Sequence, residues 1–551
     1  MPKVAPVTQT RKPNFRFLCC LLAVCFCGFP GFADANGAQA DTLRRGLGPE
    51  PDSLHIHQAQ GLAAINLLRD LREGLLTFDS AGNLAPGVAS GWQVLDGGKR
   101  YVFTLRSDAR WSNGDPLTAG DFVRAWRLAL SPGTSAVTAG LLRELLNAEA
   151  VMNGHLPAGE LGVSILDDGR LQVMLTKPAP WILEILAHPV SFPLHAIEGG
   201  STSDKKVSDA GVPGAGHGFG PFNGPFELAG WTPRSHIRLR RNAAFHAVAE
   251  VMADEVEYYP IEEPATELAR YRAGELDITE TIPAGRFAWL QENLAGELHV
   301  SPYLGSFWLG LNMHHAELGS SADLRQALAL AIDRDILVRV VLGAGELTAW
   351  GIVPPGIPGY TPQHMRLAEA GQAEREAEAR RLYAAAGHGE RQPLLLELRY
   401  NTSGVHRRIA VAVASMWKQV LGVNTELINE EWKVFVNNRR LGVVTQVFRG
   451  GWIADFADPS SFLDLFVSGN ELNTTFHSDA AFDSLVEKAG TAGGGARMEL
   501  LQQAETQLLE TMPVIPLYHY VSRHLVRPEV RGYTDNARDI HLSRYLSKDQ
   551  L

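Results

Sequence analysis

Residues 448–459 read Phe448-Arg449-Gly450-Gly451-Trp452-Ile453-Ala454-Asp455-Phe456-Ala457-Asp458-Pro459. In this stretch the carboxylate of Asp455 lies among apolar and aromatic residues, just after a glycine pair. A carboxylate in such surroundings is partly desolvated, so it is either protonated or held against a cation. That cation is either Arg449 or an ammonium group of a ligand. An internal ion pair or a helix cap would explain the stretch if it stood alone.

The first 40 residues have the composition of a secretory signal. Four basic residues precede an apolar run from Phe17 to Phe29, and Ala38-Gln39-Ala40 follows. The pattern predicts cleavage after Ala40, because the apolar run is too short to span a bilayer. A lipoprotein is the alternative, since Leu22-Ala23-Val24-Cys25 resembles a lipobox, although Val24 replaces the small residue expected before the cysteine. We therefore expect an exported, soluble protein.

All four cysteines of the 551-residue chain lie in this segment. The mature chain would contain no thiol, which excludes disulfides, cysteine–metal sites and thiol catalysis. The formal charge of the whole chain is −11, and loss of the four basic residues and one acidic residue of the segment leaves about −14. An acidic surface argues against binding to nucleic acid or anionic lipid. The length allows two or more hydrophobic cores, and hence several lobes.

Alternating strand and helix patterns predict α/β lobes. Residues Tyr101 to Leu105 alternate behind an Asp-Gly-Gly turn, as in a half-buried antiparallel strand. Thr118 and Asp121 form a capping box that opens a helix running to Leu130. The other predicted elements are paired strands at 226–228 and 237–241, helices at 320–341, 372–386 and 409–420, and a strand at 394–400.

Most signatures of enzymes and metal sites are absent. The chain has no HExxH, GxSxG or P-loop motif. The glycine-rich stretch 211–224 lacks a phosphate-binding pattern and is predicted to be a structural loop, as is Gly493-Gly494-Gly495 between two helices. His55 and His57 would share one face of a strand, but no acid or cysteine nearby completes a ligand set, and His314-His315 is weaker still.

Several segments, in order along the mature chain, resemble the oligopeptide-binding proteins of ABC transporters, the solute-binding family of the peptide/nickel type. No single segment is decisive, but the ordered series is specific. The segments are Glu73-Gly74-Leu75-Leu76, Leu84 to Ala89, Trp111 to Ala119, Ala331-Ile332-Asp333-Arg334-Asp335, Tyr400-Asn401-Thr402-Ser403, Val413 to Lys418 and the stretch around Asp455.

This resemblance implies an α/β fold of the periplasmic binding protein type II kind, with three lobes and a hinged ligand cleft. Lobe I would comprise residues 41–72, 200–305 and 521–551. Lobe II would comprise residues 73–199, and lobe III residues 306–520. In that family an extended peptide is buried between lobes I and III and pairs with the receptor backbone like an added strand.

The resemblance also implies where the ends and backbone of a peptide would bind. Asp455 matches the aspartate that holds the α-ammonium group of the ligand. Gly451, Trp452 and Ile453 match the strand whose amides and carbonyls pair with the peptide. A zwitterionic ligand needs a desolvated anion at one end and cations at the other, so the implied site agrees with the residues themselves.

Basic and polar residues complete the implied site. Arg449, Arg440 and His406 match the basic residues that line the groove and meet the ligand carboxylate at different peptide lengths. Asn223 and Tyr520 are expected to line the same cleft. No cofactor or metal is expected.

Three departures from the family pattern affect this site. The chain has Leu54-His55-Ile56-His57 where relatives show Leu-Asp-Pro-His. Gln60 stands where oligopeptide binders place an acidic contact, and Thr138 stands where they place a groove tyrosine. Gln60 and Thr138 are thus candidate ligand contacts that change the charge and stacking of the pocket.

The resulting hypothesis is a monomeric periplasmic receptor that captures short peptides and delivers them to the transmembrane subunits of an ABC permease, without enzymatic activity. Alternatives within the family are receptors for murein peptides, dipeptides, glutathione, haem or a nickel chelate. An alternative of another class is a secreted hydrolase that uses Asp455 and Asp458 as paired carboxylates. A sensor or chaperone with the receptor fold is a third possibility.

Overall fold

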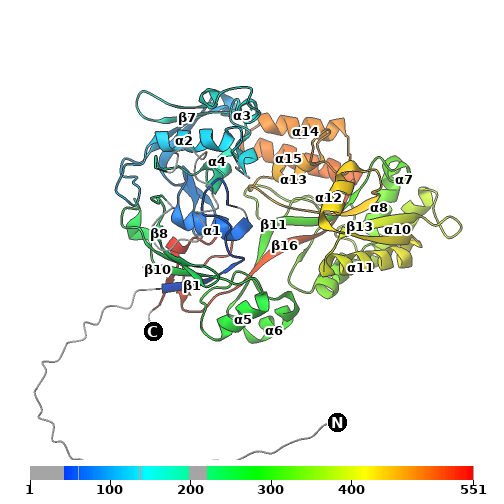
Figure 1. Cartoon of the computed structure of the whole chain (residues 1–551). Helices are drawn as coiled ribbons and strands as arrows, with labels where there is room; N and C mark the ends of the chain where they lie inside the picture. The colour runs from blue at the N-terminus through cyan, green and yellow to red at the C-terminus, as the bar shows by residue number, and fades with distance from the viewer. Residues whose placement is uncertain (1–41, 60, 135, 137, 198–219, 550–551) are drawn as a thin grey trace, which may run out of the picture. The chain divides into compact units, whose positions relative to one another are not determined.

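The computed structural model describes residues 42–59, 61–134, 136, 138–197 and 220–549. Within these residues the strands form one six-stranded sheet, two four-stranded sheets and two two-stranded sheets (Figure 1). The α/β class predicted from the sequence is confirmed. The expected signal segment with its four cysteines, Gln60 and most of the stretch 211–224 lie outside the described residues.

One four-stranded sheet combines the start of the described chain with its middle. The strand order is β1 (Thr42–Gly48), β10 (Glu255–Pro260), β9 (His236–Arg241) and β8 (Phe226–Thr232). Strands β1 and β10 are parallel, and the other neighbours are antiparallel. The predicted pairing of 226–228 with 237–241 is confirmed, since Leu228 lies opposite Leu239.

The second four-stranded sheet lies between these segments in the sequence. Its order is β4 (Ala89–Leu95), β5 (Arg100–Leu105), β7 (Leu171–Met174) and β6 (Val163–Ile165). Helix α2 (Ala119–Leu130) begins at the predicted capping box, where the backbone N–H of Thr118 donates to the Asp121 carboxylate over 2.8 Å. Other elements between β1 and β8 in the sequence are α1 (Gly61–Leu71), β2 (Leu76–Phe78), β3 (Leu84–Pro86), η2 (Ala139–Leu142), α3 (Ala148–Met152), α4 (Ile182–Ile185) and η4 (Pro189–Ser191).

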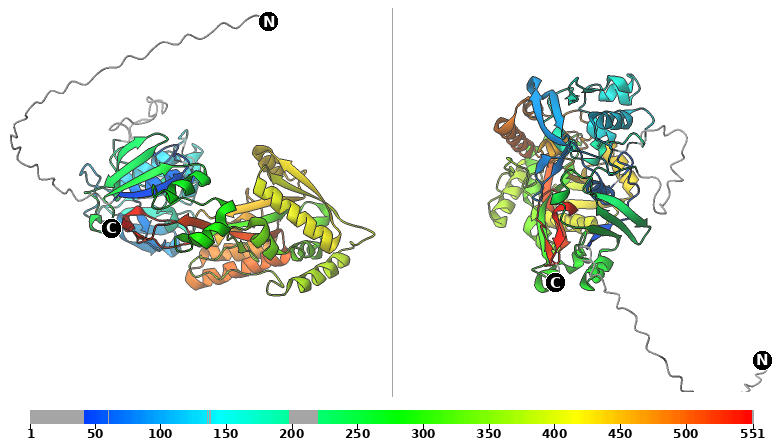
Figure 2. Two further views of the ribbon diagram at one scale, coloured as in Figure 1. Left: turned by 90° about the horizontal axis from the view of Figure 1, so that it is seen from below. Right: turned by 90° about the vertical axis from the view of Figure 1, so that its left-hand side faces the viewer.

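The six-stranded sheet carries the stretch around Asp455. Its order is β12 (Leu347–Thr348), β16 (Val514–Leu525), β11 (Leu298–Leu311), β15 (Val447–Ile453), β13 (Leu395–Asn401) and β14 (Asn424–Glu430). Strand β15 runs antiparallel to β11 and parallel to β13. The long strands β11 and β16 lie side by side along most of their length (Figure 2). The last two-stranded sheet pairs β17 (Val530–Arg531) with β18 (Ser547–Lys548).

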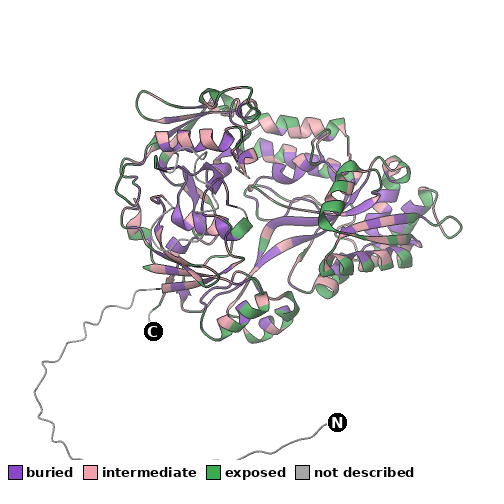
Figure 3. Cartoon of the chain, in the orientation of Figure 1, coloured by how far each residue is buried: buried purple, intermediate pink, exposed green. Residues whose placement is uncertain are grey.

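Helices cover this sheet with their apolar sides. Trp417 of α11 (Gly404–Leu421) is fully buried, and its indole N–H donates to the carbonyl of Leu328 in α8 (Ala322–Leu330) over 2.8 Å. Figure 3 shows buried residues along β11 and β16 and exposed ones on the outer sides of α10 and α11.

No helix in the described part of the chain is both long and apolar enough to cross a membrane. The helices after β10 are α5 (Pro264–Arg272), α6 (Phe287–Asn293), α7 (Ala316–Ser320), α8 (Ala322–Leu330), α9 (Arg334–Ile336), α10 (Gln372–Ala385), α11 (Gly404–Leu421), α12 (Trp432–Leu441), α13 (Ser460–Leu463), α14 (Ala480–Thr491) and α15 (Gly494–Thr511).

Two sequence predictions need correction. The single helix expected at 320–341 is broken, because Asp333 leaves the helical conformation and its carboxylate accepts from the N–H of Ile336 to start a new helix. A π-helical turn, Leu337–Leu342, then continues the segment. The glycine run expected to be a loop also differs, since α15 begins at Gly494.

Candidate ligand-binding site

Strand β15 has one edge without a partner strand in its second half. Among the described residues, its pairing with β13 stops at Phe448, whereas its pairing with β11 continues to Ile453. The segment from Arg449 to Ile453 therefore presents backbone amides and carbonyls along its other edge. Such an edge accepts an extended peptide as an additional strand.

The glycine pair of β15 allows close packing at this edge. Gly450 lies opposite Trp308 of β11, and a Cβ atom on Gly450 would lie only 2.2 Å from the indole nitrogen of Trp308. A Cβ atom on Gly451 would lie 3.2 Å from both the carbonyl oxygen of Ser306 and the hydroxyl oxygen of Tyr520. Only glycine fits at position 450 without displacing a buried indole, which explains the first residue of the pair.

Asp455 follows directly after the open edge. The backbone N–H of Ala454 still donates to Leu304 of β11 over 2.8 Å, and that of Asp455 donates to the Ser461 hydroxyl over 3.2 Å. These bonds fix the backbone on which the carboxylate is carried. Within the described residues we find no hydrogen bond or ion pair to the Asp455 carboxylate itself.

The surroundings of Asp455 disfavour an isolated negative charge. Its side chain reaches solvent, yet protein atoms around it desolvate the carboxyl group and raise its pKa, while the positive charge of Arg143 acts in the opposite direction. The Asp455 carboxylate therefore gains from a bound cation. The partial desolvation expected from the sequence agrees with this raised pKa, and among the described residues Arg449 is not the ion-pair partner of Asp455.

Asp455 lines a cavity of about 290 Å³. Two other charged groups in this cavity are already paired, because the Arg538 guanidinium contacts the Glu184 carboxylate at 2.6 Å. Burial keeps His188 neutral at pH 7 by lowering its pKa to about 3. Asp455 is thus the unpaired acid of the cavity. The lining residues come from α1, β2, η2, the segment around α4, β11, the end of β15 and the segment before β18. They include Leu62, Ile65, Arg69, Phe78, Leu141, Tyr303, Ile453 and Phe456.

Arg449 lies among aromatic rings. Its guanidinium carbon is 5.3 Å from the centroid of the Phe307 ring, and its Nε atom is buried without a hydrogen-bond partner in the described structure. The positive charge of Arg449 lowers the pKa of the nearby Tyr520, although burial raises that pKa by more. No carboxylate within the described residues forms an ion pair with Arg449. A ligand carboxylate would find a partly desolvated cation here.

His406 is close to Arg449 but is not a second cation. Desolvation, and then repulsion from Arg449, lower its pKa to about 4. One ring nitrogen, Nδ1, lies 2.9 Å from the side-chain oxygen of Asn401. His406 is therefore neutral at pH 7 and acts as a hydrogen-bonding group, and the charge expected at this side of the groove comes from arginine alone.

Arg440 is exposed near the end of α12, beside a second cavity of about 130 Å³. This cavity also contains Gly451, Trp452 and the neighbouring Arg439. Desolvation lowers the pKa of Arg439 to about 10, with a further contribution from Arg449. Arg439 was not among the residues predicted for the site, although two consecutive arginines at the end of an amphipathic helix are a usable signal.

The other four residues predicted to contact the ligand are Asn223, Thr138, Tyr520 and Gln60, and they do not share one position. Asn223 is buried, and its amide donates to the backbone carbonyl of Glu73 over 2.8 Å, which gives it a structural role. Thr138 lies directly before η2, whose Leu141 lines the Asp455 cavity. Tyr520 adjoins the glycine pair, as described above. Gln60 lies outside the described residues.

The histidine pairs singled out in the sequence do not gain a third metal ligand in the described structure. His57 is buried, and desolvation lowers its pKa to about 3. His314 stacks on Phe476, with ring centroids 4.5 Å apart. The group of three metal-ligating side chains found in the described residues lies elsewhere, at His524, Asp539 and His541.

The fold and the site define an α/β binding protein with an open strand edge that ends at an unpaired carboxylate. The chain belongs to the bacterial extracellular solute-binding proteins, family 5, whose family model matches residues 83–474. The type II periplasmic binding protein fold implied by the resemblance is confirmed.

Two curated relatives are similar over nearly their whole length. The periplasmic oligopeptide-binding protein OppA of Salmonella typhimurium is 37% identical over 501 residues, which cover 90% of each chain. The periplasmic murein peptide-binding protein MppA of Escherichia coli is 34% identical over 545 residues, which cover 97% of this chain and 98% of the relative.

Solved structures of this family superimpose well. The unliganded open form of the murein tripeptide-binding protein MppA has a TM-score of 0.84 at 33% identity, covering 93% of this chain and 98% of that chain. Haemophilus influenzae OppA in complex with the peptide RPPGFSPFR has a TM-score of 0.71 at 32% identity, covering 93% and 99% of the two chains.

Proposed function

We propose that this protein is a periplasmic receptor that captures short peptides and delivers them to the permease of an ABC importer. The observation that carries the proposal is the open edge of β15, which ends at the unpaired carboxylate of Asp455. The names of the two curated relatives, one a receptor for oligopeptides and the other for murein peptides, support the same function.

In this proposal the peptide extends along residues 449–453. Gly451, Trp452 and Ile453 bond to its backbone, which gives affinity that is largely independent of side chains. Asp455 holds the α-ammonium group, and Arg449 or the more distant Arg440 meets the carboxylate. The neutral His406 and Tyr520 supply hydrogen bonds, and Thr138 is a candidate contact from η2.

The protein is proposed to act through closure of three lobes around the ligand, with the boundaries given in the sequence analysis. Ligand shifts an open–closed equilibrium only through contacts that the closed form makes better. The Asp455–ammonium contact is one such interaction, because both groups lose water when the cleft closes. The protein is expected to work as a monomer without a cofactor.

The secreted hydrolase alternative finds no support in the position of Asp458. Its carboxylate is buried and contacts the Arg497 guanidinium at 2.7 Å and 3.3 Å, so it is held in a structural ion pair. An acid that is locked in this way is not available as the partner of Asp455 in general acid–base chemistry.

Native mass spectrometry of the mature protein, purified without unfolding, tests the proposal. We expect bound ligands that, after denaturation and sequencing, prove to be short peptides with free amino termini. A ladder of unrelated sequences indicates a general peptide receptor, and a single cell-wall peptide indicates a murein peptide receptor. Bound haem, glutathione or a metal chelate in place of peptide contradicts the proposal.

A further inference from the structure

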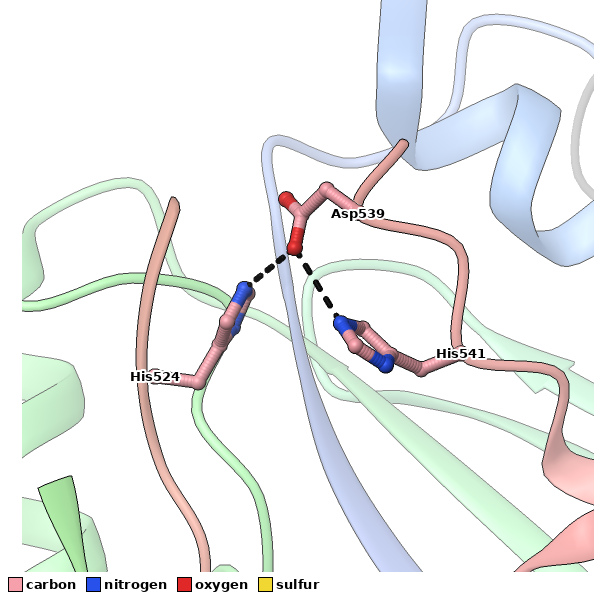
Figure 4. A group of neighbouring side chains, drawn as sticks. All are labelled: His524, Asp539 and His541. Carbon is pink, nitrogen blue, oxygen red and sulfur yellow. Dashed lines mark hydrogen bonds and ion pairs between the residues drawn. The ribbon is translucent and has the colours of Figure 1, made fainter. Parts of the chain in front are cut away.

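Two histidines and one aspartate converge close to the wall of the Asp455 cavity, because Arg538 and Ile540, the neighbours of Asp539 and His541 in the sequence, line that cavity. His524 lies near the end of β16, while Asp539 and His541 lie two residues apart in the segment before β18 (Figure 4). The ligand-capable atoms of all three side chains lie within 4.8 Å of one another. Both histidine Nε2 atoms face the same carboxylate oxygen, Asp539 Oδ1, at 2.7 Å from His524 and 3.2 Å from His541.

The outer contacts of these side chains hold them in ligating orientations. The Nδ1 atom of His524 lies 2.9 Å from the backbone carbonyl of Thr279, so the other ring nitrogen points to the centre of the cluster. Metal-ligating histidines typically have such a carbonyl or carboxylate behind them. The ring of His541 stacks on Tyr533, with centroids 4.3 Å apart and planes inclined by 19°. Its Nε2 atom also lies 3.1 Å from the Tyr533 hydroxyl, a contact that a bound ion would replace. The side chains of His524 and His541 are only 7% and 6% exposed, so neither is a mobile surface histidine.

The cluster faces a small polar cavity of about 10 Å³, the space of one water molecule or ion. Glu280 lines this cavity, and its carboxylate has no hydrogen-bond partner among the described residues. Arg45 lines it too, but its Nη1 atom donates to the His541 carbonyl, at 2.8 Å, and to the Ser543 hydroxyl, at 2.7 Å. The buried carboxylate of Asp70 offsets the charge of Arg45, because each group favours the charged form of the other. The Tyr258 hydroxyl joins them, since it accepts from Arg45 over 3.2 Å and donates to Asp70 over 2.6 Å.

We propose that His524, Asp539 and His541 form a binding site for a divalent transition metal ion, with Zn²⁺ as the first candidate. Two imidazole nitrogens and one carboxylate oxygen are a common ligand set for zinc, and Glu280 or water completes four-coordination. Ligand atoms in a tetrahedral zinc site, with bonds of about 2.0–2.1 Å, are about 3.4 Å apart. The distance of 3.2 Å from Asp539 Oδ1 to the Nε2 atom of His541 nearly meets this value. The distance of 2.7 Å from Asp539 Oδ1 to the Nε2 atom of His524 would have to increase slightly.

The place of the site gives the ion a structural consequence. His524 belongs to β16 of the six-stranded sheet, and Thr279 lies behind its ring. Ile278, next to Thr279, forms isolated bridges to Arg45 of β1 in the first sheet and to Val526 just after β16. An ion bound here would connect the end of β16 to the C-terminal segment next to the first sheet. It would thus stabilise the junction between the two sheets.

Titration of the mature, EDTA-treated protein with Zn²⁺ by calorimetry tests the site, and Co²⁺ serves as a spectroscopic probe. We expect one equivalent to bind, with the visible d–d bands of tetrahedral cobalt. His524→Ala and His541→Ala should each weaken Zn²⁺ binding by at least about 10- to 100-fold, the range for loss of a group that supports a metal. His364→Ala is the matched control, since His364 is 48% exposed beside Glu369 and should leave binding unchanged.

Asp539→Asn separates metal binding from a purely structural cluster. The amide keeps the size of the side chain but is a poor zinc ligand, so the folded variant should lose the cobalt spectrum. Circular dichroism of each variant in EDTA establishes that it is folded. Failure of the wild-type protein to bind Zn²⁺, or equal binding by the wild type and the folded Asp539→Asn variant, overturns the proposal.

Discussion

The guanidinium of Arg449 lies over the ring of Phe307, with its carbon 5.3 Å from the ring centroid, on neighbouring strands of the six-stranded sheet. The aromatic ring holds the cation without neutralising its charge, since a cation–π contact leaves the formal charge in place. This relationship gives the groove a cation that is free to bind a ligand anion and is less screened than an arginine in water.

Arg449→Gln should therefore weaken the binding of a tripeptide by about tenfold or more, equivalent to about 1.4 kcal/mol. Arg440→Gln, at an exposed position, should have a smaller effect. Calorimetry of both variants, with the tripeptide as the free acid and as the C-terminal amide, measures these losses of affinity. If the amidated peptide shows the same loss on Arg449→Gln as the free acid, Arg449 does not bind the carboxylate.

Replacement of the two glycines of β15 should have unequal effects on stability. Gly450→Ala places a methyl group 2.2 Å from the Trp308 indole, which is only 6% exposed and cannot move easily. We expect a loss of about 1–3 kcal/mol in the free energy of unfolding. Gly451→Ala makes contacts of 3.2 Å and should cost less. Urea denaturation of both variants checks this order, and equal losses would contradict the packing described for β15.

The buried ion pair of Asp458 and Arg497 should be important for stability. The two side chains are 9% and 3% exposed, and removal of one partner leaves the other charge buried. Arg497→Met should lower the free energy of unfolding by about 3–5 kcal/mol. Arg240→Met, which breaks a pair whose arginine is 62% exposed, should cost about 1 kcal/mol or less. Similar losses for both variants in chemical denaturation would show that burial does not govern the effect.

Buried histidines should make stability depend on pH. Desolvation, with a smaller contribution from His364, lowers the pKa of His519 to about 3. The unfolded chain binds a proton on this histidine near pH 6.5, so between pH 6.5 and 3 the unfolded state binds more protons and stability falls on acidification. The contribution is up to about 1.4 kcal/mol per pH unit.

Other buried groups act in the opposite direction, so this contribution has to be isolated by comparison. Burial raises the pKa of Glu267 to about 7, which favours the folded state as the pH falls from 7 towards 4.5. Urea denaturation of the wild type and His519→Gln at pH 7 and pH 5 gives the difference. The wild type should lose more stability than the variant over this interval, and an identical pH response would show that His519 is not held neutral.

Local patterns predicted much of the fold. The strand at Tyr101–Leu105 and the capping box of Thr118 and Asp121 depend on neighbouring residues alone and are confirmed. The break at Asp333 was missed, because an aspartate within an apolar helical pattern becomes a cap only when the tertiary structure turns the chain there.

The site was predictable only in part for a similar reason. The desolvation of Asp455 follows from its own neighbours in the sequence, whereas the absence of an ion pair with Arg449 in the described structure depends on the tertiary fold. The neutral state of His406 depends first on burial and then on Arg449, and both result from the tertiary fold. The cluster of His524, Asp539 and His541 combines a strand end with a later loop, and no spacing rule joins them.

We expect Asp455 to bind the α-ammonium group of a peptide. Calorimetry should compare a free tripeptide with its N-acetylated form on the wild type and on Asp455→Asn. Loss of one partner of such a pair costs about 2–5 kcal/mol, so the variant should bind the free peptide about 30-fold more weakly or worse, and acetylation should weaken binding to the wild type similarly. The variant should discriminate little between the two peptides. Unchanged affinity of Asp455→Asn for the free peptide would contradict the account.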